Sequence, residues 1–165
     1  MTGLDGAHAC LQDLISTYAV ADFLLVGDRD LVRSIPDAVR SYVADGRAVA
    51  WNPVVPQGVS AAIDAEIALQ PVSPALARRL RCDDPDEVWP RWTRCEVAAK
   101  LLNLPVLSWL NWPNLEVPAA FVRRVVMAQV VVGDVLVCCG LTWDDGALPC
   151  NDRAPGQGEG EPAMQ

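Results

Sequence analysis

The hydrophobic positions of this chain are densest between residues 121 and 141, where eight valines fall within twenty-one residues. Valine suits a packed strand better than a helix because its branched side chain is restricted at χ1. Gly133-Asp134 divides the run, and such a dipeptide between two apolar runs is typical of a two-residue hairpin turn. We therefore predict a buried antiparallel hairpin of Val125–Val132 and Val135–Leu141. Its expected core residues are Val126, Val130, Val135 and Val137. A helix is the alternative for Val125–Val132, because Pro118 suits a first helical turn.

The N-terminal part of the chain alternates between helical and strand-like patterns. Apolar residues recur every three or four positions over Asp5–Ala19, which predicts an amphipathic helix. The apolar run Asp22–Gly27 ends in glycine and predicts a buried strand, and Arg47–Trp51 predicts a second one. Between them, a serine followed by proline and aspartate is typical of a helix start, so we expect a helix over Ser34–Ala44. These elements form a βαβ-like unit, in which parallel pairing is expected.

The middle of the chain has mainly helical patterns. Isoleucines four residues apart predict a helix over Ser60–Gln70, and Ser73-Pro74 begins a short helix that reaches Leu80. A longer helical region begins in the acidic stretch at residue 83 and ends near Asn103. We expect Pro90 to start a new helix within this region, because proline cannot donate the helical hydrogen bond. Val106–Trp109 is predicted to be a strand.

Together these elements predict an α/β or α+β fold with an N-terminal helix, a βαβ-like unit, a helical middle and a central valine-rich hairpin. Apolar residues make up 52% of the 165 residues, which is enough for a sizeable core. We predict a single globular domain over residues 1–146. Residues 147–165 are rich in glycine, proline and acid, and we expect a disordered acidic tail there.

Charge and hydropathy exclude two classes of partner. The formal net charge is −8, and half of this excess lies after Trp143. Because a nucleic-acid surface needs a basic stripe, we expect no nucleic-acid partner. We also expect no membrane span, because Gln129 and Gly133-Asp134 interrupt the most apolar run. The N-terminus resembles no secretory signal, which predicts a cytoplasmic protein.

The cysteines do not indicate a disulfide framework or a metal site. There are six of them, and a cytoplasmic protein keeps its thiols reduced. Cysteine and histidine residues show no zinc-type spacing, and the chain has a single histidine, His8. A nucleophilic role for Cys138 or Cys139 would require a nearby base. We therefore predict no bound metal and no cofactor.

Carboxylates after the first predicted strand are the candidates for catalysis. Asp28 and Asp30 follow this strand directly, and ligands of open α/β sheets bind beyond strand ends. Glu66 or Glu96 would supply a further carboxylate. The alternative is that both aspartates are turn and cap residues in a solvated loop. A glycine-rich phosphate loop is absent from the sequence.

Aromatic residues in the helical middle are the candidates for binding a partner. Four of the six tryptophans fall within twenty-four residues, among prolines and next to Arg91. They are Trp89, Trp92, Trp109 and Trp112. Tryptophan is enriched at the energetic centres of protein interfaces. The alternative is burial in the core, which we expect for Trp92 and Trp109 and for at least two of the four.

The sequence supports two hypotheses of function. The first is a small acidic binding or accessory protein that acts through a protein-protein surface, such as an adaptor, an inhibitor, an immunity-type protein or a phage or assembly component. The second is an α/β enzyme or small-ligand binder that uses Asp28 and Asp30. A flat surface that bears tryptophan would favour the first hypothesis. A deep pocket that unites the aspartates with another carboxylate would favour the second.

Overall fold

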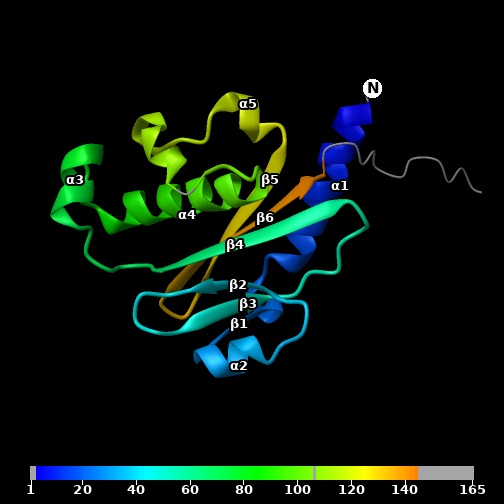
Figure 1. Cartoon of the computed structure of the whole chain (residues 1–165), viewed down its shortest axis with the longest axis horizontal. Coiled ribbons are helices and arrows are strands. Elements are labelled where there is room, and N and C mark those ends of the chain that lie inside the picture. The colour runs from blue at the N-terminus through cyan, green and yellow to red at the C-terminus, as the bar shows by residue number, and fades with distance from the viewer. Residues whose placement is uncertain (1–2, 106, 145–165) are drawn as a thin grey trace, which may run out of the picture.

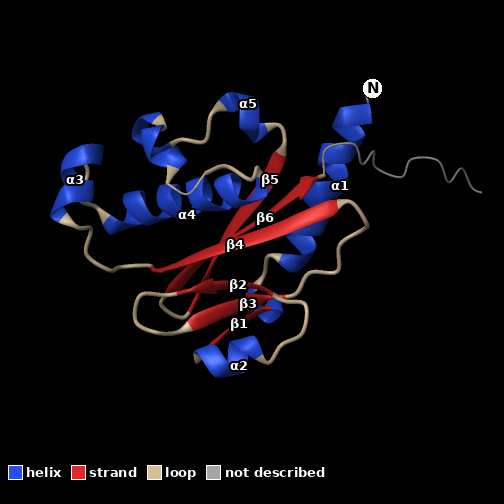
Figure 2. Ribbon diagram, viewed as in Figure 1, coloured by secondary structure: helices blue, strands red, loops and turns tan. Residues whose placement is uncertain are grey.

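The protein has an α+β fold, which a computed structural model describes for residues 3–105 and 107–144 (Figures 1 and 2). In these ranges the helices are α1 (Gly3–Tyr18), α2 (Arg29–Arg33), α3 (Pro74–Leu80), α4 (Pro85–Leu101) and α5 (Ala119–Val122). Three short 3-10 helices are η1 (Ala21–Phe23), η2 (Ser108–Asn111) and η3 (Pro113–Leu115). The strands are β1 (Leu24–Gly27), β2 (Val39–Tyr42), β3 (Ala48–Trp51), β4 (Val59–Ile67), β5 (Val125–Val132) and β6 (Val135–Trp143). The predicted tail at residues 147–165 lies outside the described residues.

The strands form two three-stranded antiparallel sheets, which we call sheet A and sheet B. Sheet A has the order β1-β3-β2, and sheet B has the order β4-β6-β5. The predicted hairpin is confirmed as β5 and β6, with Val132 opposite Val135 across the turn. Gly133 has a φ of 64°, which a glycine adopts without strain. Of the four valines predicted in the core, Val130 is only half-buried, while the other three are buried.

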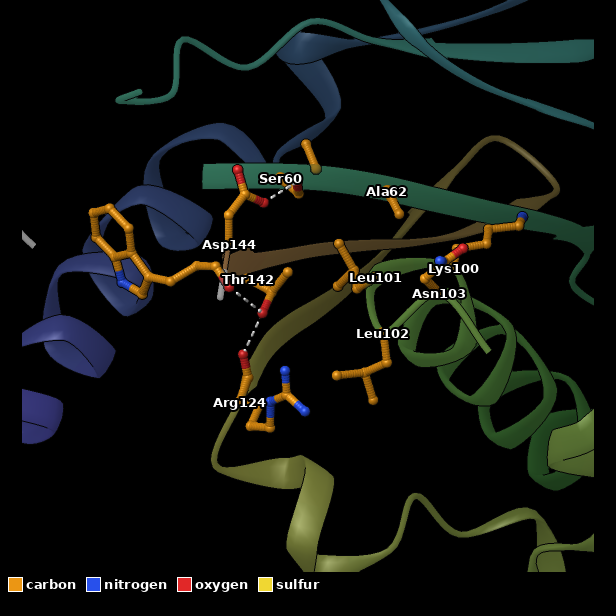
Figure 3. Close-up of a pocket in the computed structure, with 11 residues that line it drawn as sticks. Ser60, Ala62, Lys100, Leu101, Leu102, Asn103, Arg124, Thr142 and Asp144 are labelled. Atoms are coloured by element: carbon orange, nitrogen blue, oxygen red, sulfur yellow. Dashed lines mark hydrogen bonds between the residues drawn. The ribbon is translucent and has the colours of Figure 1, made fainter. Parts of the chain in front are cut away.

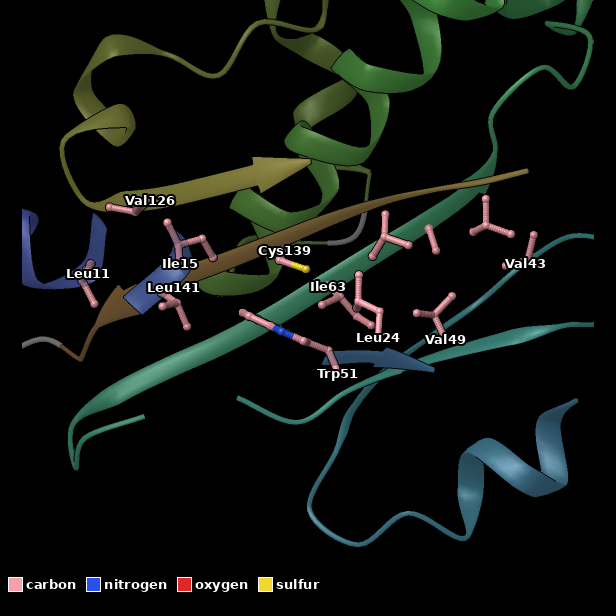
Figure 4. Packing of buried hydrophobic residues seen from close by; sticks show 13 residues of the cluster. Leu11, Ile15, Leu24, Val43, Val49, Trp51, Ile63, Val126, Cys139 and Leu141 are labelled. Atoms are coloured by element: carbon pink, nitrogen blue, oxygen red, sulfur yellow. The ribbon is translucent and has the colours of Figure 1, made fainter. Parts of the chain in front are cut away.

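The main core lies between the two sheets (Figure 4). Trp51 of sheet A is completely buried there, and its Nε1 donates to the carbonyl oxygen of Tyr18 at 2.8 Å. The predicted N-terminal helix is confirmed as α1, which adds Leu11 and Ile15 to the same cluster. From sheet B the cluster receives Ile63, Ala65, Val126, Val135, Val137, Cys139 and Leu141.

Helices cover the outer faces of both sheets. The short helix α2 packs on the outer face of sheet A through Val32, against Ala48 and Ala50. The long helix α4 crosses the outer face of sheet B, where Val97 packs against Ala62 and Cys138. Figure 1 shows α2 and α4 on opposite sides of the molecule. None of the described helices is long and apolar enough to cross a membrane.

Five predictions made from the sequence are wrong. The strands over Asp22–Gly27 and Arg47–Trp51 pair antiparallel, as β1 and β3, because β2 enters the sheet on the other side of β3. The predicted helix over Ser34–Ala44 is instead a turn followed by β2. Ser34 ends α2, with its Oγ donating to the carbonyl oxygen of Leu31 at 2.7 Å.

The predicted helix over Ser60–Gln70 is strand β4. Isoleucines at positions 63 and 67 lie on one face of a helix, but an even spacing also places them on one face of a strand. Instead of the predicted strand at Val106–Trp109, the described residues there lead into η2. Pro90 does not begin a new helix but lies inside α4. Because proline has no N–H, the carbonyl of Asp86 receives no helical hydrogen bond. Asp86 is exposed, so water can donate to this carbonyl instead.

Sheets A and B meet along a seam between β2 and β4. The two strands lie next to each other, but within the described part of the chain they form no hydrogen-bonded ladder (Figure 2). Side chains link them instead. Ser41 Oγ of β2 donates to Asp64 Oδ1 of β4 at 3.3 Å. At the edge of the molecule, Arg47 donates to both carboxylate oxygens of Asp134, at 2.7 and 2.8 Å.

Candidate functional site

The candidate sites are arranged along α4, which has a hollow at each end. At its C-terminal end a pocket of about 450 Å³ lies between the helix and the ends of β4 and β6. At its N-terminal end a groove of about 540 Å³ separates the helix from η3, α5 and β5. We call these the C-terminal pocket and the cap groove. A cluster of charged side chains lies between them, beneath the last turn of α4.

The polar groups of the C-terminal pocket bond mainly to one another (Figure 3). Ser60 Oγ donates to Asp144 Oδ1 at 2.6 Å, and Thr142 Oγ1 donates to the carbonyl oxygen of Arg124 at 2.6 Å. Lys100 lines the pocket with its stem, and its side chain runs along β4 away from Ser60 and Asp144 (Figure 3). The pocket is therefore polar, but its hydroxyls are already engaged.

Asp64 is the most perturbed acid of the described residues. It points from β4 toward α4 and is only 5% exposed. Lys100 Nζ donates to Asp64 Oδ1 at 2.9 Å and to the carbonyl oxygen of Ile63 at 3.0 Å. Burial raises the pKa of Asp64 to about 7, although Lys100 opposes the shift. A carboxyl group that titrates near neutral pH is suited to proton transfer or to pH sensing.

Two further carboxylates surround this pair. Glu96 Oε1 lies 3.4 Å from Lys100 Nζ, and its charge contributes to the raised pKa of Asp64. Burial also raises the pKa of Glu66, which accepts from Gln70 Nε2 at 2.7 Å. One lysine therefore faces three acids. We call these four residues the seam cluster: Asp64, Glu66, Glu96 and Lys100. In the ranges that the structure describes, no group of three or more histidine, cysteine, aspartate or glutamate residues could hold a metal ion.

The cap groove has an apolar wall and a charged wall. Leu115, Val117 and Val122 lie on the side of η3 and α5. Arg91 and Arg94 project from α4 on the other side, together with acidic residues at the start of the helix. Arg91 forms an ion pair with Glu87 at 2.8 Å. Arg94 is exposed and has no ion-pair partner in the described part of the chain.

The four tryptophans of the helical middle differ in burial. Trp89 and Trp109 are core residues, 7% and 2% exposed, so neither presents a flat surface to a partner. Trp92 is half-buried between them, with edge-to-face contacts to both rings. Trp112 is also half-buried and packs against Phe121, with 5.8 Å between ring centroids. Trp112 therefore contacts α5 through Phe121, the residue before Val122 of the cap groove.

Asp28 and Asp30 lie far from these features, at α2 on sheet A (Figure 1). Asp28 caps α2 by accepting from the backbone N–H of Leu31 at 2.8 Å. Asp30 is exposed and lies 3.7 Å from Arg33 in a surface ion pair. The fold brings neither of them to Glu66 or Glu96. Both aspartates have the geometry of cap and turn residues.

Sequence reasoning selected Glu66 and Glu96 as further carboxylates but missed Asp64. The reason is the predicted helix over Ser60–Gln70, in which Asp64 and Glu66 are two positions apart and would lie on opposite sides. Strand alternation was the available signal. In a strand, residues 62, 64 and 66 share one face, and two of them are acids.

The described cysteines have no redox or metal-binding geometry. Cys10, Cys82, Cys95, Cys138 and Cys139 are free thiols, and Cys150 lies outside the described residues. No protein-family model matches the sequence, and comparisons with curated proteins and with solved structures give no match. The functional argument therefore rests on the site residues themselves.

Proposed function

We propose that the protein is a binding or accessory protein that acts through a protein-protein surface centred on the cap groove. The single observation that carries this proposal is the composition of the groove. An apolar wall with the exposed residue Val122 faces two arginines, and charges of both signs surround it. Protein interfaces commonly combine an apolar centre, arginine and a polar rim in this way.

The distribution of charge supports the same surface. Residues 71–124 contain eight lysines and arginines against six acids, although the whole chain has a net charge of −8. The helical segments around the groove therefore form the least acidic part of a strongly acidic protein. The groove lining holds Asp86, Glu87 and Glu116 beside Arg91 and Arg94. Arg94 has no ion-pair partner among the described residues, so a partner that places an acidic group against Arg94 fits this surface.

Hydrogen bonds and aromatic contacts hold the residues beneath the groove in place. Gln129 of β5 donates to the carbonyl oxygen of Pro90 at 2.8 Å and to Thr93 Oγ1 at 2.9 Å, which fixes α4 on the sheet beneath the groove. The Trp89, Trp92 and Trp109 rings support the neighbouring turns. A partner that binds a rigid surface loses less conformational entropy in the complex. The enzyme hypothesis based on Asp28 and Asp30 has no comparable support, since those residues cap and flank α2.

Affinity capture tests this proposal. The full chain, immobilised through its N-terminus, is incubated with native lysate, and retained proteins are quantified by mass spectrometry. We expect a partner that is retained by the native chain and lost, by roughly thirtyfold or about 2 kcal/mol, with Val122→Asp or Arg94→Glu. Equal retention by the native chain and both variants would contradict the proposal.

Two control variants sharpen this experiment. Val54→Asp places the same charge on another exposed valine, which is 72% exposed in the loop before β4. Asp30→Ala removes a residue of the enzyme hypothesis at an exposed position. Neither control should change retention. If Asp30→Ala abolished retention while Val122→Asp did not, the surface at α2 would replace the cap groove.

A further inference from the structure

The seam between β2 and β4 depends on side chains, because the two strands share no ladder in the described ranges. Asp64 is central to it. Its Oδ1 accepts from Ser41 across the seam and from Lys100 above it, at 3.3 and 2.9 Å. Its other oxygen, Oδ2, is buried and has no hydrogen-bond partner among the described residues. An ionised carboxylate at this place is therefore incompletely solvated.

Charged neighbours increase this cost. The groups that face Asp64 are Lys100 and Glu96 from α4, Glu66 from β4, the Cys138 thiol from β6 and the Ser41 hydroxyl from β2. With every acid ionised, three negative charges share the single positive charge of Lys100. Burial raises the pKa of the Cys138 thiol, which therefore stays neutral. Loss of a proton from Asp64 thus adds an uncompensated charge to the seam.

We propose that the seam between β2 and β4 is a proton-controlled joint, which is closed while Asp64 is protonated and loosens when Asp64 is ionised. The neutral carboxyl removes the repulsion from Glu66 and Glu96 and lowers the cost of the unpartnered oxygen. Ionisation favours separation of β2 from β4, because water can then reach Asp64. The joint lies between the two sheets, which the chain connects through the loop of residues 52–58.

The sign of the pH dependence follows from linkage. The pKa of Asp64 is about 7 in the folded protein and about 3.9 in an unfolded chain, so the folded protein holds an extra proton between these pH values. The raised pKa of Asp64 therefore adds to the free energy of unfolding at low pH, and this contribution is lost as the pH rises through about 7. One such proton increases the unfolding equilibrium constant by about tenfold per pH unit in this range. Glu66, whose pKa is also raised, acts in the same direction.

Denaturant unfolding between pH 5 and pH 8 gives the first test. The free energy of unfolding of the native chain should fall as the pH rises. Asp64→Asn should reduce the slope of this free energy against pH by the contribution of about one proton. Asp30→Asn makes the same change at an exposed carboxylate and should leave the slope unchanged. If Asp64→Asn retained the full slope, the proposal would be overturned. If this variant failed to fold, Glu96→Gln would serve, since it removes a repelling charge and should move the pH dependence to lower pH.

Amide hydrogen exchange, corrected for intrinsic pH effects, tests the joint itself. Between pH 6 and pH 8 the amides of β2 and β4 along the seam should lose protection by about tenfold more than those of β5. Asp64→Asn should remove this difference. Equal loss of protection in β2, β4 and β5 would show that ionisation acts on global stability alone, and it would overturn the joint.

Discussion

Helix α4 is tied to sheet B by two polar side chains that lie at opposite ends of one rung of the sheet. Asp64 of β4 and Gln129 of β5 both lie opposite Cys138 of β6, and both point toward α4. Gln129 is neutral, and its amide donates two good hydrogen bonds. Asp64 is ionisable, and one of its oxygens lacks a partner. The same rung therefore holds one tie that is independent of pH and one that depends on it.

This difference matches the surroundings of each tie. Gln129 lies beneath the cap groove, where the proposed binding surface benefits from a fixed helix. Asp64 lies at the seam, where two sheets meet without a ladder. A neutral amide costs little to bury once it is bonded, whereas a buried carboxylate depends on its neighbours and on pH. Three substitutions separate these effects, beginning with one that disturbs both ties.

Gly140→Ala should have the largest effect, because it separates α4 from the sheet. A Cβ at this position would lie 2.4 Å from Val97 Cγ1 and 2.9 Å from Leu101 Cδ1. We expect a loss of about 4 kcal/mol in the free energy of unfolding, at the upper end for overpacked cores. This loss in the free energy of unfolding is measured by urea denaturation, with circular dichroism as the signal.

A double-mutant cycle checks the cause of this loss. Val97→Ala removes the closest clashing atom, so Gly140→Ala and Val97→Ala together should cost at least about 1 kcal/mol less than the sum of the single changes. Additive costs would show that the two residues do not compete for the same space.

Lys100→Met should have an intermediate and pH-dependent effect. It removes the cation from buried Asp64, so we expect a loss of about 3 kcal/mol at pH 8. At pH 5 the carboxyl of Asp64 is neutral, so the change removes the bond to Ile63, a neutral bond to Asp64 and the partly exposed pair with Glu96, which together cost about 1.5 kcal/mol. Arg91→Met, which removes an exposed pair from the same helix, should cost less than about 0.5 kcal/mol at both pH values. Equal losses for Lys100→Met at pH 5 and pH 8 would contradict the assignment of the pH-dependent tie.

Gln129→Leu should have the smallest effect and no pH dependence. It removes two hydrogen bonds, but Thr93 Oγ1 still donates to the carbonyl oxygen of Trp89 at 3.1 Å. We expect a loss of about 1 kcal/mol, the same at pH 5 and pH 8. Thermal unfolding at the two pH values provides the measurement. A loss that grew with pH would show that both ends of the rung titrate.

Local patterns predicted the parts of the fold that depend on neighbours in the chain. The valine run with Gly133-Asp134 predicted the hairpin, because turn chemistry and strand preference agree there. Helix α1 followed from its apolar period. Strand β4 was predicted as a helix because the spacing of Ile63 and Ile67 suits both periods, and the pairing with β6 that decides between them lies more than sixty residues away.

The candidate site was predictable only in part for the same reason. Glu96 and Arg91 are visible as charged positions of a helix, and their ion-pair partners Lys100 and Glu87 lie one turn away on the same helix, but the residues of β4 and β5 that α4 covers cannot be read from this local pattern. The importance of Asp64 depends on burial by β2 and α4, and no local pattern reports such burial. The tryptophans show the limit of composition: their clustering was correct evidence of a shared environment, yet two of the four rings are in the core.

Alternation along β6 gives the protein a pair of internal reporters. Cys138 faces α4 and Cys139 faces the core between the sheets, and both are completely buried. Burial raises the pKa of Cys139 to about 12 and raises that of Cys138 as well, so neither thiol reacts while its layer stays closed. A thiol reagent that modifies Cys138 detects α4 leaving the sheet, whereas one that modifies Cys139 detects separation of the sheets. The thiols of two adjacent residues, on opposite faces of one strand, thus distinguish the two ways in which this molecule can open.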